Sequence, residues 1–317
     1  MEKKEIIRQI RRASNINGGA LLLFTAIIYG GLIGSNFVFF MIFPDGNESA
    51  YAVLTAALNV FQVAVLFGLA FFIRAAAGKS LVNFGFERPA VPGVKVVKYV
   101  VITLSLSYIS GYASEFILGM VQSAGIEMSD LIPDTSTTFL LVVNLCASVL
   151  FAPLFEELLF RGALTGNVSR FGGMSMALAV GISFGFWHEN VFQLIYASFI
   201  GVLLCWLTMK TGSIYPAIAV HFIFNGGTAP AQLLDLVDTS LADTAYTLYI
   251  LFEVVVIIAG LIILFSTLLI DKKELSIKND NYPEISEGTK FFAYFTAPLT
   301  VLAIAANIVF MVMNARG

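Results

Sequence analysis

Long apolar stretches divide the chain, and they constrain its fold more than any other feature of the sequence. Most are long enough to cross a hydrocarbon layer of about 30 Å as a helix. They lie near residues 19–43, 50–73, 94–120, 137–160, 173–190, 191–209, 213–234, 245–270 and 291–313. Only 12% of the residues are charged, whereas soluble domains typically have about 25%. The sequence therefore predicts an all-α polytopic membrane protein, a bundle of eight to nine transmembrane helices.

The placement of the basic residues supports nine alternating spans. Of the 18 Lys and Arg residues, five lie in the N-terminal tail and twelve in turns on the same side as the tail, with only Arg316 opposite. Cytoplasmic loops carry an excess of Lys and Arg. We therefore expect a multi-pass protein of the cell membrane with a cytoplasmic N terminus.

One long polar segment, residues 271–290, interrupts the apolar pattern near the C terminus. We expect the helix beyond it to be an accessory to the main bundle. The predicted units are a basic cytoplasmic tail (1–18), N-terminal transmembrane helices (19–136), a central core (137–230), a further transmembrane helix (231–270), the polar linker (271–290) and a C-terminal transmembrane helix (291–317).

Two glutamates and an arginine occur within the apolar run "APLFEELLFRGAL", residues 152–164. Ionised side chains at membrane depth are costly and usually face a bundle interior or a wet cavity. Glu157 and Arg161 are four residues apart, glutamate first, which is the favoured order for an ion pair on a helix. We expect this pair to leave Glu156 pointing elsewhere. Alternatively, the cluster lies at the membrane interface, with its charges reaching the headgroups.

The two histidines of the chain, His188 and His221, both lie in apolar helical sequence. Asn225 follows His221 by one helical turn, on the same face. A helical hairpin turning at residues 170–173 would place Glu156 and His188 at the same height. By the same helical rise, His221 would differ from His188 in height by up to about 10 Å.

A carboxylate and an imidazole in one wet cavity can activate water for attack on a carbonyl group. A second histidine and an asparagine amide can then stabilise the oxyanion that forms. Glu156, His188 and His221 also form a possible ligand set for Zn²⁺, because two imidazoles and a carboxylate hold zinc in some catalytic sites. At this stage metal-free and zinc-dependent chemistry both remain open.

Other catalytic patterns fit less well. The zinc motif H-E-x-x-H is absent, since "HENVF" has Phe192 at the position of the second histidine. The G-x-S-x-G match "GISFG", residues 181–185, lies within a helix and follows no strand, so Ser183 is expected to serve packing. Cys146 and Cys205 both lie in predicted spans, which argues against a disulfide framework.

The segments "EELLFR", "FGFWH" and "HFIFN" resemble the three ordered motifs E-E-x-x-x-R, F-x-x-x-H and H-x-x-x-N of the CAAX protease and bacteriocin-processing (CPBP, Abi) family, which includes type II CAAX prenyl endopeptidases. The resemblance covers roughly residues 137–230, the expected catalytic core. It implies an intramembrane endopeptidase in which Glu156 and His188 activate water and His221 and Asn225 form the oxyanion site, with Glu157 and Arg161 in support. Both a metalloprotease and a metal-free glutamate mechanism are associated with the family.

The resemblance implies a membrane-associated or lipidated protein or peptide as substrate, with CAAX-type or bacteriocin and peptide-signal processing as the alternatives. We expect a bacterial origin, contacts with membrane lipids, and no nucleic-acid partner. Two other functions remain open, a non-proteolytic membrane immunity or interaction protein and, with less support, a transporter. A transporter predicts paired repeats with interrupted helices, and the sequence contains none.

Overall fold

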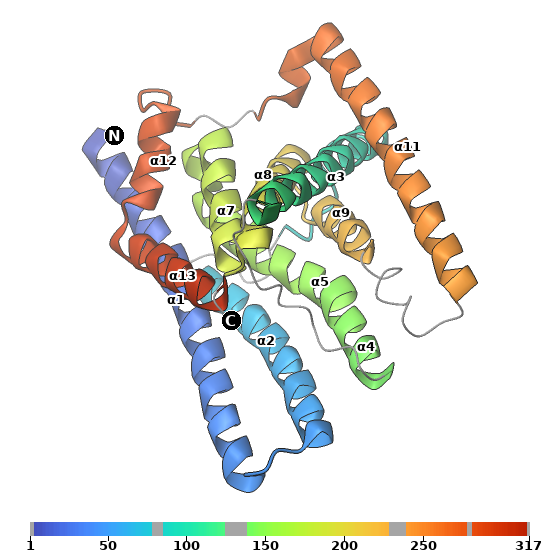
Figure 1. The fold of residues 1–317 in the computed structure, drawn as a ribbon. Helices are drawn as coiled ribbons and strands as arrows, with labels where there is room; N and C mark the ends of the chain where they lie inside the picture. The colour runs from blue at the N-terminus through green and yellow to red at the C-terminus, as the bar shows by residue number, and fades with distance from the viewer. Residues whose placement is uncertain (1–2, 78–84, 124–137, 228–238, 278–280, 316–317) are drawn as a thin grey trace.

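The computed structural model describes residues 3–77, 85–123, 138–227, 239–277 and 281–315 of the chain (Figure 1). Within these ranges every regular element is a helix, which confirms the predicted all-α class. The longest helices are α1 (Lys3–Ile42), α2 (Glu48–Ala76), α3 (Gly93–Ser123), α8 (Val191–Thr211) and α11 (Thr239–Asp271). The shorter elements are α4 (Thr138–Leu145), η1 (Cys146–Phe151), α5 (Ala152–Glu157), η2 (Leu158–Thr165), α6 (Gly166–Val168), η3 (Ser169–Phe171), α7 (Met174–Trp187), α9 (Tyr215–Gly226), η4 (Lys272–Leu275), α12 (Glu287–Phe295) and α13 (Pro298–Ala315).

The predicted count of eight to nine transmembrane helices is not confirmed. In the described part of the chain, six helices are long and apolar enough to cross a membrane, or seven if α12 and α13 are taken as one span. The predicted span 173–190 is α7, which has 14 residues and is therefore about 21 Å long. The predicted span 213–234 contains α9, which has 12 residues, and its residues 228–234 lie outside the described ranges. Both helices are shorter than the roughly 30 Å hydrocarbon layer.

The chain from Leu141 to Phe171 forms one span in which α-helical and π-helical turns alternate. The π-helical segments η1 and η2 flank the short helix α5. Pro153, near the start of α5, has no backbone N–H to donate to the preceding turn, so the regular hydrogen-bond ladder is broken at this point. Single π-helical turns are frequent at functional sites. This irregular span carries Glu156, Glu157 and Arg161.

Glycines bring α7 and α8 close together. A Cβ atom added to Gly181 would lie 2.3 Å from the backbone nitrogen of Val202, and one added to Gly201 would lie 2.7 Å from the carbonyl oxygen of Gly181. Gly185 faces Ser198 and Leu194 in the same way. Small residues spaced by four let helix backbones approach closely in membranes. The sequence "GISFG" is therefore a helix-packing motif in this fold.

The C-terminal segment is not an accessory helix, and that expectation is wrong. The predicted helix 291–313 is two helices, α12 and α13, which meet at an angle of 67°. Pro298 begins α13, and a proline disfavours helical geometry in the residue before it. Tyr294 is fully buried in the main core, and a Cβ on Gly18 of α1 would lie 2.4 Å from the nitrogen of Thr300. The two C-terminal helices therefore belong to the bundle.

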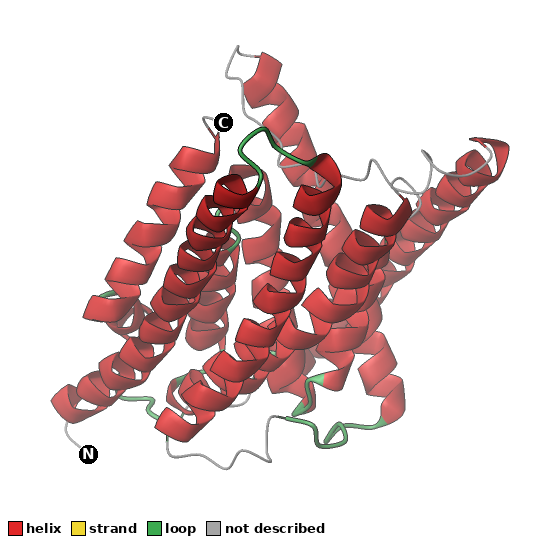
Figure 2. Ribbon diagram, turned by 90° about the horizontal axis from the view of Figure 1, so that it is seen from below, coloured by secondary structure: helices red, strands yellow, loops and turns green. Residues whose placement is uncertain are grey.

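Several basic residues meet at one end of the bundle. Lys95 and Lys98 form ion pairs with Glu274, at 3.3 Å and 2.9 Å. Lys210 donates to the carbonyl oxygen of Ser276 at 2.7 Å. Figure 2 shows the N and C termini at opposite ends of the bundle.

Candidate active site

The motif residues come from four helical segments that pack together. Glu156 and Glu157 end α5, Arg161 lies in η2, His188 follows α7, and His221 and Asn225 lie on α9. Helix α5 contacts α9, and η2 contacts both α7 and α8. Residues that are up to 69 positions apart, such as Glu156 and Asn225, therefore lie in one region of the bundle.

The Glu157–Arg161 ion pair predicted from the spacing is present. Arg161 Nη1 donates to Glu157 Oε1 at 2.8 Å, and both side chains are fully buried. Arg161 Nη2 also donates to the carbonyl oxygen of Gly201 at 3.2 Å. Its guanidinium carbon lies 4.6 Å from the centre of the Phe184 ring, a cation–π geometry. The guanidinium group is thus held between α5, α7 and α8.

His221 lies between the two glutamates, a contact that sequence analysis did not find. Its Nδ1 is 2.8 Å from Glu157 Oε1, and its Nε2 is 3.7 Å from Glu156 Oε2. An ionised carboxylate only accepts, so Nδ1 carries the proton of this bond, an assignment made from the bonding. The distance to Glu156 is too long for a direct hydrogen bond but suits a bridging water or reacting group. Glu157 therefore orients His221 with Nε2 toward Glu156.

His188 is held by its own helix and by aromatic rings. Its Nδ1 lies 2.8 Å from the carbonyl oxygen of Phe184 and must donate to it, so Nε2 of the neutral ring carries the lone pair. The Phe184 ring meets the His188 ring edge to face at 4.5 Å and the His221 ring at 5.9 Å, measured between ring centres. One phenylalanine thus contacts both imidazoles.

Asn225 makes a contact that bears on its expected role. Its Nδ2 donates to the carbonyl oxygen of Ser148, in the π-helical segment η1, at 2.9 Å. This bond ties α9 to the helix that carries the two glutamates. An oxyanion role for Asn225 would use the second N–H of the same amide.

Glu189, which follows His188, is a buried residue that sequence analysis did not single out. Its φ of 52° lies in the left-handed region, which is uncommon for residues other than glycine. Thr25 of α1 donates to its Oε1 at 3.3 Å, and the Asn307 amide of α13 donates to the same oxygen at 3.1 Å when its nitrogen faces Glu189. Asn314 donates to the Glu189 carbonyl oxygen at 3.1 Å. The turn after His188 is therefore fastened to helices from both ends of the chain.

Ser183 serves helix packing, as expected. Its hydroxyl donates to the carbonyl oxygen of Ala179, one turn earlier, at 2.9 Å, and the side chain is buried. It also lies 3.5 Å from the Tyr294 hydroxyl of α12. These contacts are typical of serine within a packed helix.

The possible zinc set of Glu156, His188 and His221 is not formed. Within the described ranges, no three His, Cys, Asp or Glu side chains are grouped closely enough to hold one metal ion. His221 directs one nitrogen to Glu157, and His188 directs one to a backbone carbonyl. Both bonds use Nδ1, and such a bond from the other ring nitrogen is also usual in histidines that bind a metal through Nε2.

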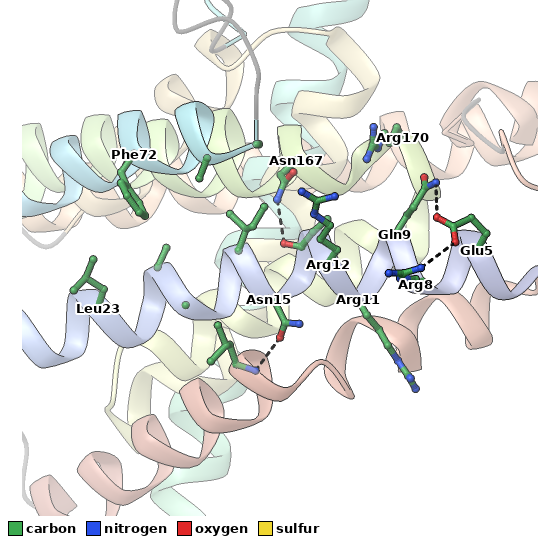
Figure 3. A pocket seen from close by; sticks show the side chains of 17 residues that line it. Glu5, Arg8, Gln9, Arg11, Arg12, Asn15, Leu23, Phe72, Asn167 and Arg170 are labelled. Carbon is green, nitrogen blue, oxygen red and sulfur yellow. Dashed lines mark hydrogen bonds and ion pairs between the residues drawn. The ribbon is translucent and has the colours of Figure 1, made fainter.

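A cavity of about 1300 Å³ lies away from these residues. It is bounded by α1, the end of α2, the α6–η3 turn and Leu299 at the start of α13 (Figure 3). None of the seven motif residues lines it. This cavity is therefore separate from the candidate active site.

The family model of "Type II CAAX prenyl endopeptidase Rce1-like" proteins matches residues 138–227, from α4 to the residue after α9. This part of the chain is CAAX endopeptidase-like. The match covers less than a third of the 317 residues but includes all seven motif residues. It confirms the resemblance drawn from the three motifs. The apolar helices indicate a multi-pass membrane protein. The chain matches no curated protein and no solved structure.

Proposed function

We propose that the protein is an intramembrane endopeptidase that hydrolyses peptide bonds of membrane-associated or lipidated substrates. One observation supports this function most. Within the segment that matches the endopeptidase family, Glu156 Oε2 and His221 Nε2 face each other at 3.7 Å inside the bundle. Glu156 is only 8% exposed, so its carboxylate is kept among other protein groups.

Glu156 is the general base in this mechanism. It takes a proton from a water molecule, and the hydroxide attacks the carbonyl carbon of the scissile bond. The same proton then passes to the leaving nitrogen when the carbon–nitrogen bond breaks. His188 assists the activation of water through Nε2, since its Nδ1 is committed to the Phe184 carbonyl.

His221 and Asn225 stabilise the oxyanion that forms during the attack. For this role His221 acts as the imidazolium, with Nδ1–H donating to Glu157 and Nε2–H donating to the oxyanion. Both lie on α9, one turn apart, so their polar groups reach the same side of the helix. Glu157 and Arg161 hold His221 in place, which fixes the direction of Nε2 before substrate binds. Donors that are positioned in advance contribute strongly to acyl-transfer catalysis because they need no reorganisation.

The substrate is a protein or peptide held at the membrane, either prenylated at a C-terminal CAAX sequence or processed as a bacteriocin or signal peptide. A buried site on transmembrane helices favours substrates that partition into the same layer. The site would operate from a bacterial cell membrane, with the N terminus of the chain in the cytoplasm.

Peptide cleavage by matched variants tests this function. Purified protein in liposomes is incubated with a library of lipidated and membrane-inserted peptides, and cleavage is followed by mass spectrometry. Loss of general base catalysis in Glu156→Gln is expected to lower the cleavage rate about 100- to 10,000-fold. His188→Asn is expected to lower it also. Glu87→Gln removes the same charge from an exposed loop residue and serves as the control.

Full cleavage by Glu156→Gln with normal folding would contradict the mechanism. Substrate binding without cleavage by the wild-type protein would favour a non-proteolytic interaction protein instead. Proton-coupled uptake into liposomes in the absence of cleavage would favour a transporter.

Chelation tests the metal-free chemistry separately. Because Glu156, His188 and His221 are not grouped as ligands, exhaustive treatment with EDTA or phenanthroline is expected to leave the cleavage rate unchanged. A zinc endopeptidase treated in parallel provides the positive control. A loss of activity that added Zn²⁺ restores would contradict the expectation.

A further inference from the structure

The cavity at the N-terminal end of the bundle combines a basic end with an apolar end. We call it the arginine groove, and its walls are α1 between Glu5 and Leu23, the last turn of α2, the α6–η3 turn and Leu299 (Figure 3). Its volume is about 1300 Å³. The lining contains four arginines. Three lie on α1 (Arg8, Arg11 and Arg12) and one lies in η3 (Arg170).

The basic end carries a clear excess of positive charge. Glu5 is the one carboxylate in the lining, and it is engaged by Arg8 at 3.8 Å and by Gln9 at 3.3 Å. No ion pair joins Arg12 or Arg170 to a carboxylate of the residues that the structure describes. Figure 3 shows these two side chains on the same side of α1, although they come from different elements. Two guanidinium groups on one side of a groove favour an anion with several oxygen atoms.

The other end of the groove is apolar and open to the surrounding layer. Ile16, Ala20, Leu23 and Phe72 line it. Leu23 is 41% exposed and Phe72 is 56% exposed, on helices that are long and apolar enough to cross the membrane. A soluble anion without an apolar part gains no binding free energy from these apolar side chains. An amphipathic anion gains both charge neutralisation and apolar contact.

We propose that the arginine groove binds the headgroup of an anionic phospholipid, with the phosphodiester against Arg12 and Arg170 and an acyl chain along Leu23 and Phe72. Basic pockets between transmembrane helices on the cytoplasmic side commonly bind anionic headgroups. The groove lies at the end of α1 that the basic residues assign to the cytoplasm. The binding is independent of the proposed peptidase activity.

The bound lipid would fasten the N-terminal helix to the helix that carries the motif glutamates. Asn167 lines the groove and donates to the Ala13 carbonyl and to Asn17 Oδ1, both at 3.0 Å. Asn17 in turn donates to the carbonyl oxygen of Leu164, in η2, at 3.2 Å. A lipid bridging Arg12 of α1 and Arg170 of η3 would span the same contact. We therefore expect the lipid to raise the thermal stability of the whole chain.

Lipid binding to the full-length protein in an uncharged detergent tests the proposal. Phosphatidylglycerol, phosphatidylcholine and inorganic phosphate are titrated separately, and the dissociation constant is measured by native mass spectrometry together with the thermal unfolding midpoint. Phosphatidylglycerol is expected to bind and to raise the midpoint. Phosphatidylcholine and phosphate are expected to do neither. Arg12→Gln/Arg170→Gln is expected to bind phosphatidylglycerol about 30-fold more weakly.

The control is Lys3→Gln/Lys4→Gln, which removes two exposed charges close by on α1 but outside the groove. It is expected to retain wild-type affinity. Equal weakening by both double variants would show a diffuse surface-charge effect and would overturn the site. Binding of phosphate as strong as that of phosphatidylglycerol would overturn the lipid as the occupant, and so would equal binding of phosphatidylcholine.

A second pair of variants keeps the test valid if the arginine double variant fails to fold. Ala76 and Ala75 are adjacent exposed residues at the end of α2, but only Ala76 lines the groove. Ala76→Glu places a negative charge in the groove and is expected to weaken phosphatidylglycerol binding. Ala75→Glu adds the same charge outside it and is expected to leave binding unchanged. The same affinity in both variants would contradict the proposal.

Discussion

A single oxygen atom, Oε1 of Glu157, accepts hydrogen bonds from both Arg161 and His221. The neighbouring Glu156 lies about 100° further around the helix and faces the other nitrogen of the same imidazole. Two adjacent glutamates therefore have different tasks because their positions on one helix differ. Glu157 neutralises Arg161 and orients His221, whereas Glu156 is the residue that transfers the proton in the proposed mechanism.

This division of tasks predicts different effects on stability. Glu157→Ala leaves the buried Arg161 without its carboxylate, and breaking a buried ion pair in this way costs about 3 to 5 kcal/mol of unfolding free energy. Glu156→Ala leaves that pair intact and is expected to cost clearly less. Unfolding of both variants in detergent, followed by circular dichroism, measures the difference. Equal destabilisation of the two variants would show that the Glu157–Arg161 ion pair contributes no more to the free energy of unfolding than Glu156 does.

At the scale of the elements, three structural features position the residues of the candidate site. The π-helical turns on either side of α5 interrupt the regular helix where the motif glutamates occur. Glycines on α7 and α8 let these helices approach, so that Arg161 reaches the Gly201 carbonyl. Helices α1 and α13 hold the turn after His188 through Glu189. The N-terminal and C-terminal helices thus support a site that lies outside them.

The glycine interface gives a prediction at this scale. A Cβ on Gly181 would meet the backbone of Val202, which cannot rotate away, so Gly181→Ala is expected to cost about 1 to 3 kcal/mol of stability. Gly34→Ala is the matched control, because nothing lies within 4 Å of a Cβ at that position of α1. Thermal unfolding of the two variants tests the interface. Similar midpoints would show that α7 can move away from α8 without cost.

For the molecule as a whole, several basic residues contact the short segment that follows α11. The partners of Lys95, Lys98 and Lys210 all lie in residues 274–276, after α11. Arg170 accepts a hydrogen bond through its carbonyl oxygen from Asn281, further along the chain. Basic residues from three parts of the sequence therefore gather at one end of the bundle.

This gathering predicts the membrane topology. In a Cys146→Ser/Cys205→Ser background, Lys4→Cys and Lys273→Cys are expected to react with a membrane-impermeant maleimide only after permeabilisation of cells. Asp45→Cys, exposed in the turn after α1, is expected to react in intact cells. Labelling of Lys4→Cys and Lys273→Cys from opposite sides would contradict the arrangement. Labelling of Lys4→Cys and Lys273→Cys but not of Asp45→Cys in intact cells would show the reverse orientation. Labelling of all three would indicate leaky cells, which a cytoplasmic marker detects.

The sequence by itself determined the helical membrane class, the Glu157–Arg161 ion pair and the set of motif residues. These follow from apolar length, from a spacing of four residues, and from three short motifs, all of which are local properties of the chain. The same local rules predicted nine spans, a number that the structure does not confirm. The length of an apolar stretch does not reveal where its helix ends, and α7 and α9 are shorter than the hydrocarbon layer.

Only the tertiary structure decided which groups the motif residues meet. Glu157 and His221 are 64 residues apart, and Thr25 and Asn307 are 282 residues apart, yet each pair lies in hydrogen-bonding contact. Such contacts depend on how whole helices pack, which local spacing does not encode. For the same reason the arginine groove became visible only when α1, α2 and the α6–η3 turn came together.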